Sequence, residues 1–403
     1  MDFIKDLDGG FSVIGNVKVS GAREGKYGVT IILCPNSTAS AVFTSNKVVA
    51  APVKYTKNVV KNGKVSAVFV NSGNANCFTG EQGIKDCETL VELVSRDLKI
   101  PKEEIAISST GVIGREMPID IISKVAYESL SKLGSEPENS LAAAKAIMTT
   151  DTMPKEVAVS FEIDGVTVTV GGMCKGSGMI HPNMCTMLGF VMTDVSISKE
   201  LLTQALKEDV QDTYNMVSVD GDTSTNDTVL LFANGMAGNK EITSKDENYK
   251  KFKEALHYVN EELAKMIAGD GEGATALFEV KVIGAENKEQ AVTLSKSVVT
   301  SSLTKAAIYG HDANWGRILC ALGYSGVQFD PEKVDLYFES AAGKLKIIEN
   351  GVSTGYSEEV ATKILSEEEV TAIADMKMGT YSATAWGCDL TYDYVKINAD
   401  YRS

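Results

Sequence analysis

The amino-acid sequence predicts a mixed α/β fold, with sheets of mixed strand direction covered by helices. Residues 157–170 alternate apolar and polar side chains around Asp164-Gly165, a pair typical of a type I′ turn, and so predict an antiparallel hairpin. Residues 198–214 and 247–269 instead repeat apolar side chains at helical spacing. This second pattern predicts two amphipathic helices that cover a sheet.

The ends of these elements carry further signals. Ser198 is a typical N-cap residue, and Gly269 marks the end of the second helix. Short apolar runs at 66–71 and 186–194 predict buried strands, and the alternation over 388–398 predicts a half-buried strand. Strands and helices are therefore mixed along the whole chain, and no low-complexity linker marks a domain boundary.

Composition and charge narrow the possible functions. A chain of 403 residues with 44% hydrophobic side chains can form the hydrophobic cores of two or three domains. The formal net charge is −15 and no cluster of lysine and arginine offsets it, so the surface would repel the phosphates of a nucleic acid. Small metabolites are the expected partners.

The sequence carries no signal for export or membrane insertion. Its start, MDFIKDLDGGFSV, lacks a basic segment followed by an apolar run, and no stretch approaches the ~18 to 20 apolar residues that cross a bilayer. A cytoplasmic location is therefore expected. Seven cysteines form no CxxC pair, and their odd number leaves one outside any full set of disulfides, so reduced thiols are expected.

Two nucleophiles, Cys185 and Thr186, stand side by side before a predicted strand. A threonine hydroxyl needs a nearby base. Cleavage of the peptide bond before Thr186 would supply one, because the freed α-amine titrates near pH ~8 and lies beside the hydroxyl. Glycines at 176 and 178 would allow a strained turn ahead of this bond. The same pattern also fits a loop that enters a strand with a buried threonine.

The thiol of Cys185 is intrinsically the better nucleophile, but a cysteine hydrolase needs a histidine. The chain has only His181, His257 and His311. His181 lies four residues before Cys185, which allows a loop contact, and His257 lies inside a predicted helix. Cys185 is therefore the weaker candidate.

Two further segments could contact a substrate. Thr110-Gly111 follows a predicted short strand, and a turn of small residues there can direct donors at a developing oxyanion. Glu272 lies between glycines after the second predicted helix, where its carboxylate suits an ammonium ligand. Both segments also fit simpler descriptions, namely an ordinary turn and a helix end with a solvated glutamate.

Metal and nucleotide motifs are absent from the sequence. Asp220, Asp222 and Asp227 lie close together but lack the glycine and glutamate spacing of a calcium loop, so no metal site is expected. The chain contains neither GxGxxG after a strand nor GxxxxGK[ST]. His311 and Asp312 are adjacent and are read as structural.

Taken together, these segments resemble the ornithine acetyltransferase family, the glutamate N-acetyltransferases of arginine biosynthesis. The matching segments run in order from about residue 70 to the last residue: VNSGNAN, SSTGVIG, TTDTMPK, KGSGMIHPNMCTMLGFVMTD, SVDGDTSTND, DGEGATA, ANWGRI and DLTYDYVKINADYRS. The resemblance implies a helix-sheet-sheet-helix sandwich with a second, smaller lobe.

The resemblance also implies self-cleavage before Thr186. The products would be an α chain of residues 1–185 and a β chain of residues 186–403, which together form one core and assemble into an α2β2 heterotetramer. Relatives commonly carry alanine before the threonine, whereas this chain has Cys185, whose small side chain preserves the turn but adds a thiol.

Functional residues can be carried over from the family position by position. Thr186 corresponds to the nucleophile, and Thr110 and Gly111 correspond to the pair that stabilises the oxyanion. The substrate-contacting positions correspond to Thr152, Lys175, Thr186, Glu272, Asn398 and Ser403.

The implied reaction transfers acetyl from N2-acetylornithine to glutamate through an acetyl-threonine, releasing ornithine, with no cofactor. A bifunctional enzyme that also takes acetyl from acetyl-CoA is the alternative. A hydrolase that passes its acyl group to water, and an uncleaved binding protein for basic amino acids, are further alternatives.

Overall fold

The computed structural model describes residues 3–181 and 187–400, which form two compact units. Unit 1 comprises the described residues of 1–176, 182–215 and 223–263. Unit 2 comprises 177–181, 216–222 and the described residues from 264 onward. A mixed α/β fold with two sheets is confirmed, since each unit contains one sheet.

The described part of unit 1 contains a nine-stranded sheet in the order β1-β6-β7-β8-β10-β3-β4-β5, with β2 also paired to β3. The strands are β1 (Lys5–Leu7), β2 (Lys18–Glu24), β3 (Tyr27–Phe43), β4 (Lys64–Ser72), β5 (Ile105–Ser109), β6 (Lys155–Ile163), β7 (Val166–Lys175), β8 (Leu188–Thr193) and β10 (Thr228–Ala233). The helices are α1 (Ala51–Lys61), α2 (Gly80–Leu98), α3 (Ile119–Ser131), α4 (Pro137–Ile147) and α5 (Lys199–Asp209), with short 3-10 turns η1 (Gly10–Val13) and η2 (Lys102–Glu104). A third turn, η3 (Tyr214–Met216), begins in unit 1 and ends in unit 2. Helix α6 (Glu247–Gly269) begins in unit 1, and its last residues belong to unit 2.

The sheet of unit 1 folds over on itself at β3. The pairing of β3 with β4 shifts register between Leu33 and Ser37, and Asn36 there has φ 58°. The first half of β3 pairs with β2 and β4, whereas the second half pairs with β10. Such a bulge bends a strand and increases its twist. One long strand therefore takes part in both halves of the sheet.

The two halves of the sheet pack face to face. Ile32 and Val68 from one half share a buried cluster with Phe190 and Leu230 from the other. The alternate residues of β3 and β4 point the opposite way, into a second cluster with α2 and α3. Because side chains alternate along a strand, one half is buried on both faces.

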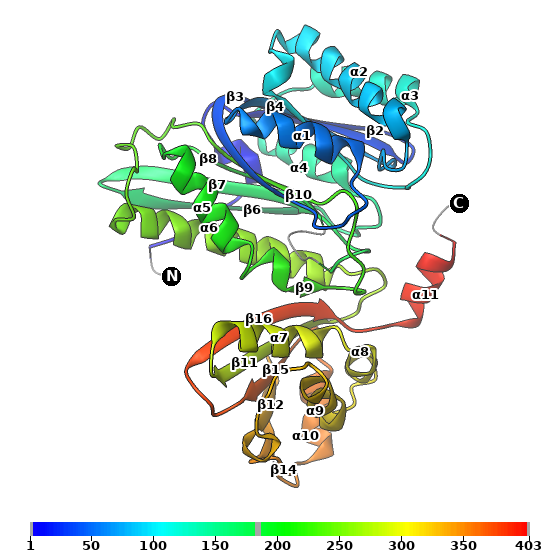
Figure 1. Cartoon of the computed structure of the whole chain (residues 1–403), viewed down its shortest axis with the longest axis vertical. Helices are drawn as coiled ribbons and strands as arrows, with labels where there is room; N and C mark the ends of the chain where they lie inside the picture. Colours follow the sequence, from blue (N-terminus) through cyan, green and yellow to red (C-terminus); the bar gives the residue numbers. More distant parts are fainter. Residues whose placement is uncertain (1–2, 182–186, 401–403) are drawn as a thin grey trace. The chain divides into compact units, whose positions relative to one another are not determined.

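The outer face of the second half is covered by α6. A Cβ atom at Gly172 on β7 would lie 2.7 Å from Leu263 and 3.1 Å from Val259, so the helix packs close to the strand. Figure 1 shows the outer layers of unit 1, with α2 and α3 above β2 to β4 and α6 below β6 to β8. The expected helix-sheet-sheet-helix sandwich is therefore present within this unit.

Unit 2 is the smaller unit and has its own sheet, seven-stranded in its described part, in the order β14-β13-β12-β15-β11-β16-β9. Its strands are β9 (Val217–Ser218), β11 (Leu277–Ala285), β12 (Asp335–Ser340), β13 (Gly343–Glu349), β14 (Val352–Ser353), β15 (Glu369–Asp375) and β16 (Tyr381–Cys388). Its other elements are α7 (Lys288–Val299), α8 (Ser302–Tyr309), α9 (Trp315–Gly323), α10 (Glu358–Leu365), α11 (Tyr392–Ala399) and the 3-10 turn η4 (Pro331–Lys333).

Several sequence-based expectations are confirmed at the level of single elements. The hairpin β6-β7 turns at Asp164-Gly165, whose φ angles are 50° and 79°. The Ser198 side chain accepts a hydrogen bond from Leu201 N at the start of α5, and α6 ends at Gly269.

The expected strand over residues 388–398 is wrong. Strand β16 ends at Cys388, and Tyr392–Ala399 forms helix α11, whose N-cap hydroxyl on Thr391 accepts a hydrogen bond from Tyr394 N. Helix α11 has no buried residue among those described, so its sequence has no inward face to give it a helical period. Chance alternation of apolar residues then resembles a strand.

Close packing of α4 against β2 gives a test of this fold. A Cβ atom at Gly21 would lie 2.0 Å from the backbone oxygen of Ala142, so Gly21→Ala should reduce the free energy of unfolding by about 1 to 3 kcal/mol. Urea unfolding measures the change. Gly15→Ala is the control, since its Cβ would meet nothing nearer than 3.8 Å. Equal stability of the two variants would contradict the packing.

Candidate active site

Thr110 and Gly111 lie where β5 ends, as the sequence predicts. Strand β5 runs parallel to β4 with Ser109 opposite Asn71, so the carboxyl ends of both strands meet at one edge of the sheet. Gly111 has φ 127°, and a Cβ there would lie 2.4 Å from the backbone carbon of Gly73. Only glycine fits this close approach of two main-chain segments.

A network of asparagine side chains holds this edge. Ser109 Oγ donates to Asn71 Oδ1 at 2.6 Å, and Asn71 Nδ2 donates to Asn74 O at 2.9 Å. The Thr110 N–H donates to Asn71 O at 2.9 Å. The segments VNSGNAN and SSTGVIG are thus joined by buried hydrogen bonds that fix the conformation of the Thr110-Gly111 turn.

Asn226 connects a third segment to this edge. Its Nδ2 donates to Ala75 O at 2.6 Å and to Ser109 O at 2.9 Å. Residues 218–227 carry part of the family resemblance and were considered as a calcium loop, but no role was predicted for Asn226. Its signal in the sequence is weak, because its partner Ser109 lies 117 residues away along the chain.

Lys175 lies at the end of β7 beside a buried carboxylate. Asp151 Oδ1 accepts hydrogen bonds from Lys155 Nζ at 2.8 Å and from Gly176 N at 2.7 Å, and Asp151 Oδ2 lies 3.8 Å from Lys175 Nζ. The Asp151 and Lys155 side chains are fully buried, and that of Lys175 is 8% exposed. Lys175 thus presents a buried ammonium group at this strand end, a group suited to binding a carboxylate ligand.

The electrostatics of this cluster favour the ionised acid. Burial alone would raise the pKa of Asp151, but Lys175 and Lys155 outweigh burial and hold the pKa well below its usual range. Lys175 was predicted from the sequence and Asp151 was not, although both belong to segments that carry the family resemblance.

Asp227 is a second acid near Lys175, and its pKa is shifted in the opposite direction from that of Asp151. Burial raises the pKa of Asp227 well above its usual range, and Ser224, Thr44, Lys175 and the backbone of Met187 offset this effect only in part. Asp227 Oδ2 has no hydrogen-bond partner among the described residues. A buried carboxyl group with a raised pKa can hold a proton at neutral pH.

In unit 2 the structure brings together Glu272 and Asn398. Asn398 Nδ2 on α11 donates to Glu272 Oε2 at 2.7 Å. Glu272 is 7% exposed, and its N–H donates to Ser177 O at 3.0 Å. A Cβ at Gly178 would lie 2.3 Å from the Glu272 carboxyl carbon, so a side chain at this position would require the Glu272 carboxylate to shift.

Of the remaining predicted residues, only Thr152 lies within the part of the chain that the structure describes. Thr152 is exposed on unit 1, directly after Asp151. Cys185, Thr186 and Ser403 lie outside the described residues. Met187, the residue after Thr186, is buried at the start of β8, and its oxygen accepts a hydrogen bond from Thr228 N at 3.0 Å.

Two of the three histidines have structural partners. His257 Nδ1 lies 2.7 Å from Asp209, and its Nε2 lies 3.2 Å from Glu261. Hydrogen bonds to Asp209 and Glu261 raise the pKa of His257 to about 10. His181 Nδ1 lies 3.0 Å from Ser218 Oγ, and burial lowers its pKa.

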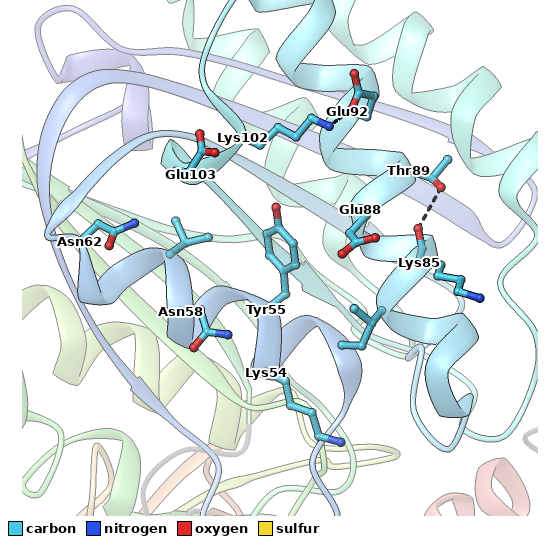
Figure 2. Close-up of a pocket in the computed structure, with 12 residues that line it drawn as sticks. Lys54, Tyr55, Asn58, Asn62, Lys85, Glu88, Thr89, Glu92, Lys102 and Glu103 are labelled. Carbon is cyan, nitrogen blue, oxygen red and sulfur yellow. Dashed lines mark hydrogen bonds and ion pairs between the residues drawn. The ribbon is translucent and has the colours of Figure 1, made fainter.

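A pocket of about 810 Å³ lies elsewhere in unit 1, between α1, α2 and η2. Figure 2 shows Tyr55 from α1 near its centre, with lysine and glutamate side chains of both charges around it. None of its lining residues is a predicted site residue. This pocket is therefore separate from the candidate active site.

Two further findings concern metals and membranes. Across residues 3–181 and 187–400, no group of three histidine, cysteine, aspartate or glutamate side chains is arranged to hold a metal ion. In the same part of the chain, every helix is too short or too polar to span a bilayer.

Unit 1 is a layered, mixed α/β unit, and the predicted catalytic residues Thr110 and Gly111 follow the end of one of its strands. Comparison with known proteins identifies the family: the ArgJ family model matches residues 15–403. The chain therefore belongs to the ArgJ family, which consists of acyltransferases of arginine biosynthesis.

Individual relatives are similar over nearly the whole chain. The "Arginine biosynthesis bifunctional protein ArgJ" of Caldanaerobacter subterraneus subsp. tengcongensis is 50% identical over 388 residues, covering 95% of each chain. The "Glutamate N-acetyltransferase" of Methanothermobacter thermautotrophicus is 46% identical over 403 residues, covering 99% of this chain and 98% of its own. The crystal structure of the Bacillus halodurans "Arginine biosynthesis bifunctional protein argJ" matches with a TM-score of 0.51 and 46% identity, over 53% of this chain and 99% of its own.

Asp151 provides a test of the buried cluster. Asp151→Asn removes the counter-charge of two buried lysines and should reduce the free energy of unfolding at pH 7 by about 3 to 5 kcal/mol. Because the folded-state pKa is lowered, the stabilisation by Asp151 is present above the unfolded pKa of ~3.9 and is lost as the pH falls below it.

The control for this variant is Glu247→Gln. Its ion pair with Lys250 is exposed, so the loss should stay within about 0.5 kcal/mol. Denaturant titrations at pH 7 and at acidic pH measure both. Similar losses for the two variants would show that Asp151 is not the required counter-ion.

Proposed function

We propose that this protein is a glutamate N-acetyltransferase that moves acetyl from N2-acetylornithine to glutamate through an acetyl ester on Thr186. The observation that carries the proposal is the match of 46% identity over 403 residues to a relative named for this activity. The arrangement of the described residues around Thr110, Lys175 and Glu272 supports the residue roles.

The first step in the proposal is maturation. The Thr186 hydroxyl attacks the Cys185 carbonyl carbon, the C–N bond breaks as the acyl group moves to oxygen, and water hydrolyses the ester. The products are the chains 1–185 and 186–403, with a free α-amine on Thr186. The small side chain of Cys185 is compatible with the turn this attack requires.

Acetyl transfer then follows in two half-reactions. The Thr186 amine accepts the hydroxyl proton while the oxygen attacks the acetyl carbonyl of N2-acetylornithine, and ornithine leaves with its α-amine reprotonated. The α-amine of glutamate next attacks the acetyl-Thr186 ester, which regenerates the hydroxyl. The two substrates therefore react in a ping-pong order.

The residues of unit 1 suit oxyanion stabilisation and binding of the substrate carboxylate. Thr110 and Gly111 are proposed to stabilise the tetrahedral oxyanion, a contribution of about 3 to 4 kcal/mol for a donor of this kind. The asparagine network supports this proposal, because a donor stabilises a transition state best when it is already fixed. Lys175 is proposed to bind the substrate carboxylate.

The residues of unit 2 suit the ammonium end of the substrate. Glu272 is proposed to bind the side-chain ammonium of ornithine, with its carboxylate oriented by Asn398. Thr152 and Ser403 are proposed as further contacts. We also propose an α2β2 heterotetramer in the cytoplasm that needs neither a metal ion nor a cofactor.

Self-cleavage is the direct test of this function. The purified protein should separate into two fragments smaller than the 43.1 kDa precursor, one beginning at Thr186 by mass spectrometry. Thr186→Val should stay as one chain and lose acetyl transfer, because it lacks the hydroxyl that acts as the nucleophile in both cleavage and transfer. Thr89→Val, on the exposed surface of α2, is the control and should be cleaved normally.

Other results would support other functions. An intact polypeptide with full transferase activity would contradict the proposed nucleophile. Release of free acetate in place of acetylglutamate would indicate a hydrolase. An uncleaved chain that binds basic amino acids without turnover would indicate a binding protein.

A bifunctional enzyme is the second candidate, because the relative of 50% identity is named bifunctional. Such an enzyme would also accept acetyl from acetyl-CoA. Incubation with glutamate and acetyl-CoA, without acetylornithine, should give no acetylglutamate above the Thr186→Val background if the transfer from acetylornithine is the sole activity. Acetylglutamate formed at a rate comparable to that with acetylornithine would establish the second activity.

A further inference from the structure

A short segment just ahead of the proposed cleavage site is held by one carboxylate. Residues 177–181 belong to unit 2, together with residues 216–222. Asp220 Oδ2 accepts a hydrogen bond from Met179 N at 2.7 Å, and Asp220 Oδ1 accepts one from Ile180 N at 2.9 Å. The two carboxylate oxygens therefore accept hydrogen bonds from two consecutive main-chain N–H groups. Hydrogen bonds of this kind are strong because the acceptor is charged.

Neighbouring contacts extend this attachment. Val219 N donates to Ile180 O at 2.7 Å, and His181 Nδ1 lies 3.0 Å from Ser218 Oγ. At the other end of the segment, Ser177 O accepts a hydrogen bond from Glu272 N at 3.0 Å. The segment is thus fixed along its length by main-chain contacts within unit 2.

Met179 adopts a backbone conformation that costs energy. Its φ angle is 57°, in the left-handed region, which disfavours a residue with a side chain by roughly 1 to 2 kcal/mol. The side chain is 42% exposed, so burial does not compensate. Consecutive N–H groups in such a turn converge on an anion, and the carboxylate of Asp220 supplies it.

Asp220 also contacts the helix that carries Asn398. Tyr394 on α11 donates from its hydroxyl to Asp220 Oδ2 at 3.3 Å. Asn398, one helical turn further on, donates to Glu272. The acid therefore links the segment before the cleavage site to a helix with a proposed substrate contact.

We propose that Asp220 is a positioning residue for self-cleavage, whose carboxylate fixes the main chain on the amino side of the bond between Cys185 and Thr186. The proposal rests on the function proposed above. Attack of a hydroxyl on the preceding carbonyl needs a defined main-chain geometry, and a misplacement of about 1 Å can slow a reaction about 100-fold. Only four residues separate His181 from Thr186, so the anchored segment limits the positions that the reacting groups can reach.

The test measures the rate at which newly made precursor is cleaved, by denaturing gel or mass spectrometry after cell-free synthesis. Asp220→Asn offers one acceptor oxygen and places an amide donor against a backbone N–H. It should slow cleavage by about 10- to 100-fold. Asp222→Asn makes the same charge change two residues away, at an exposed position, and should be cleaved at the wild-type rate.

A rescue experiment separates positioning from general stability. Glycine adopts the left-handed conformation at no steric cost, so Met179→Gly in the Asp220→Asn background should restore part of the cleavage rate. A purely structural loss elsewhere in unit 2 would not respond to glycine at this position. Thermal unfolding of each precursor, made with Thr186→Ala to block cleavage, reports whether the fold is retained.

Met179→Val keeps Asp220 intact and tests the proposal if Asp220→Asn does not fold. Valine disfavours a positive φ, so cleavage should slow while the exposed position preserves the fold. Wild-type cleavage rates in folded Asp220→Asn, or in folded Met179→Val if the first variant is unfolded, would overturn the proposal. An active wild-type protein that is never cleaved would instead overturn the proposed function.

Discussion

The candidate site in unit 1 depends on one buried carboxylate, Asp151. The hairpin β6-β7 places Lys155 opposite Cys174, so the two ends of the hairpin meet beside this acid. Its oxygens contact Lys155, Lys175 and the N–H of Gly176, the last residue before the chain passes into unit 2. Two buried ammonium groups without this counter-charge would carry a large desolvation cost. The carboxylate that stabilises the hairpin therefore also positions Lys175, the residue proposed to bind the substrate carboxylate.

Acids also hold the chain on both sides of residues 182–186, and each acts differently. On the amino side, Asp220 binds the main chain at Met179 and Ile180 in unit 2. On the carboxyl side, Asp227 contacts the backbone of Met187 in unit 1, and burial raises its pKa well above the usual value. Asp220 is partly buried and acts as a main-chain acceptor, whereas Asp227 is buried in the core and has a raised pKa.

Local sequence signals predicted the local structure well, but they did not predict contacts between segments that are distant in the sequence. The Asp164-Gly165 turn, the Ser198 cap and the end of α6 depend on neighbouring residues, and all three were predicted. Thr110-Gly111 was placed correctly at a strand end for the same reason. The bend in β3 and the contact of Asn226 with Ser109 arise from pairings between distant segments, which no local pattern records. Helix α11 was misassigned because an exposed helix buries no side chain that would give it a period.

The order of strands in unit 1 has a consequence for a chain cut before Thr186. Strands β8 and β10, which follow the cut, lie side by side between β7 and β3, which precede it, so both products contribute strands to one sheet. Neither product could leave without exposing hydrogen-bonding edges and the shared apolar interior. The cut protein would thus behave as a permanently associated pair of polypeptides. Its refolding would become a second-order process, because two molecules would have to meet before the sheet could close, and its apparent stability would rise with protein concentration.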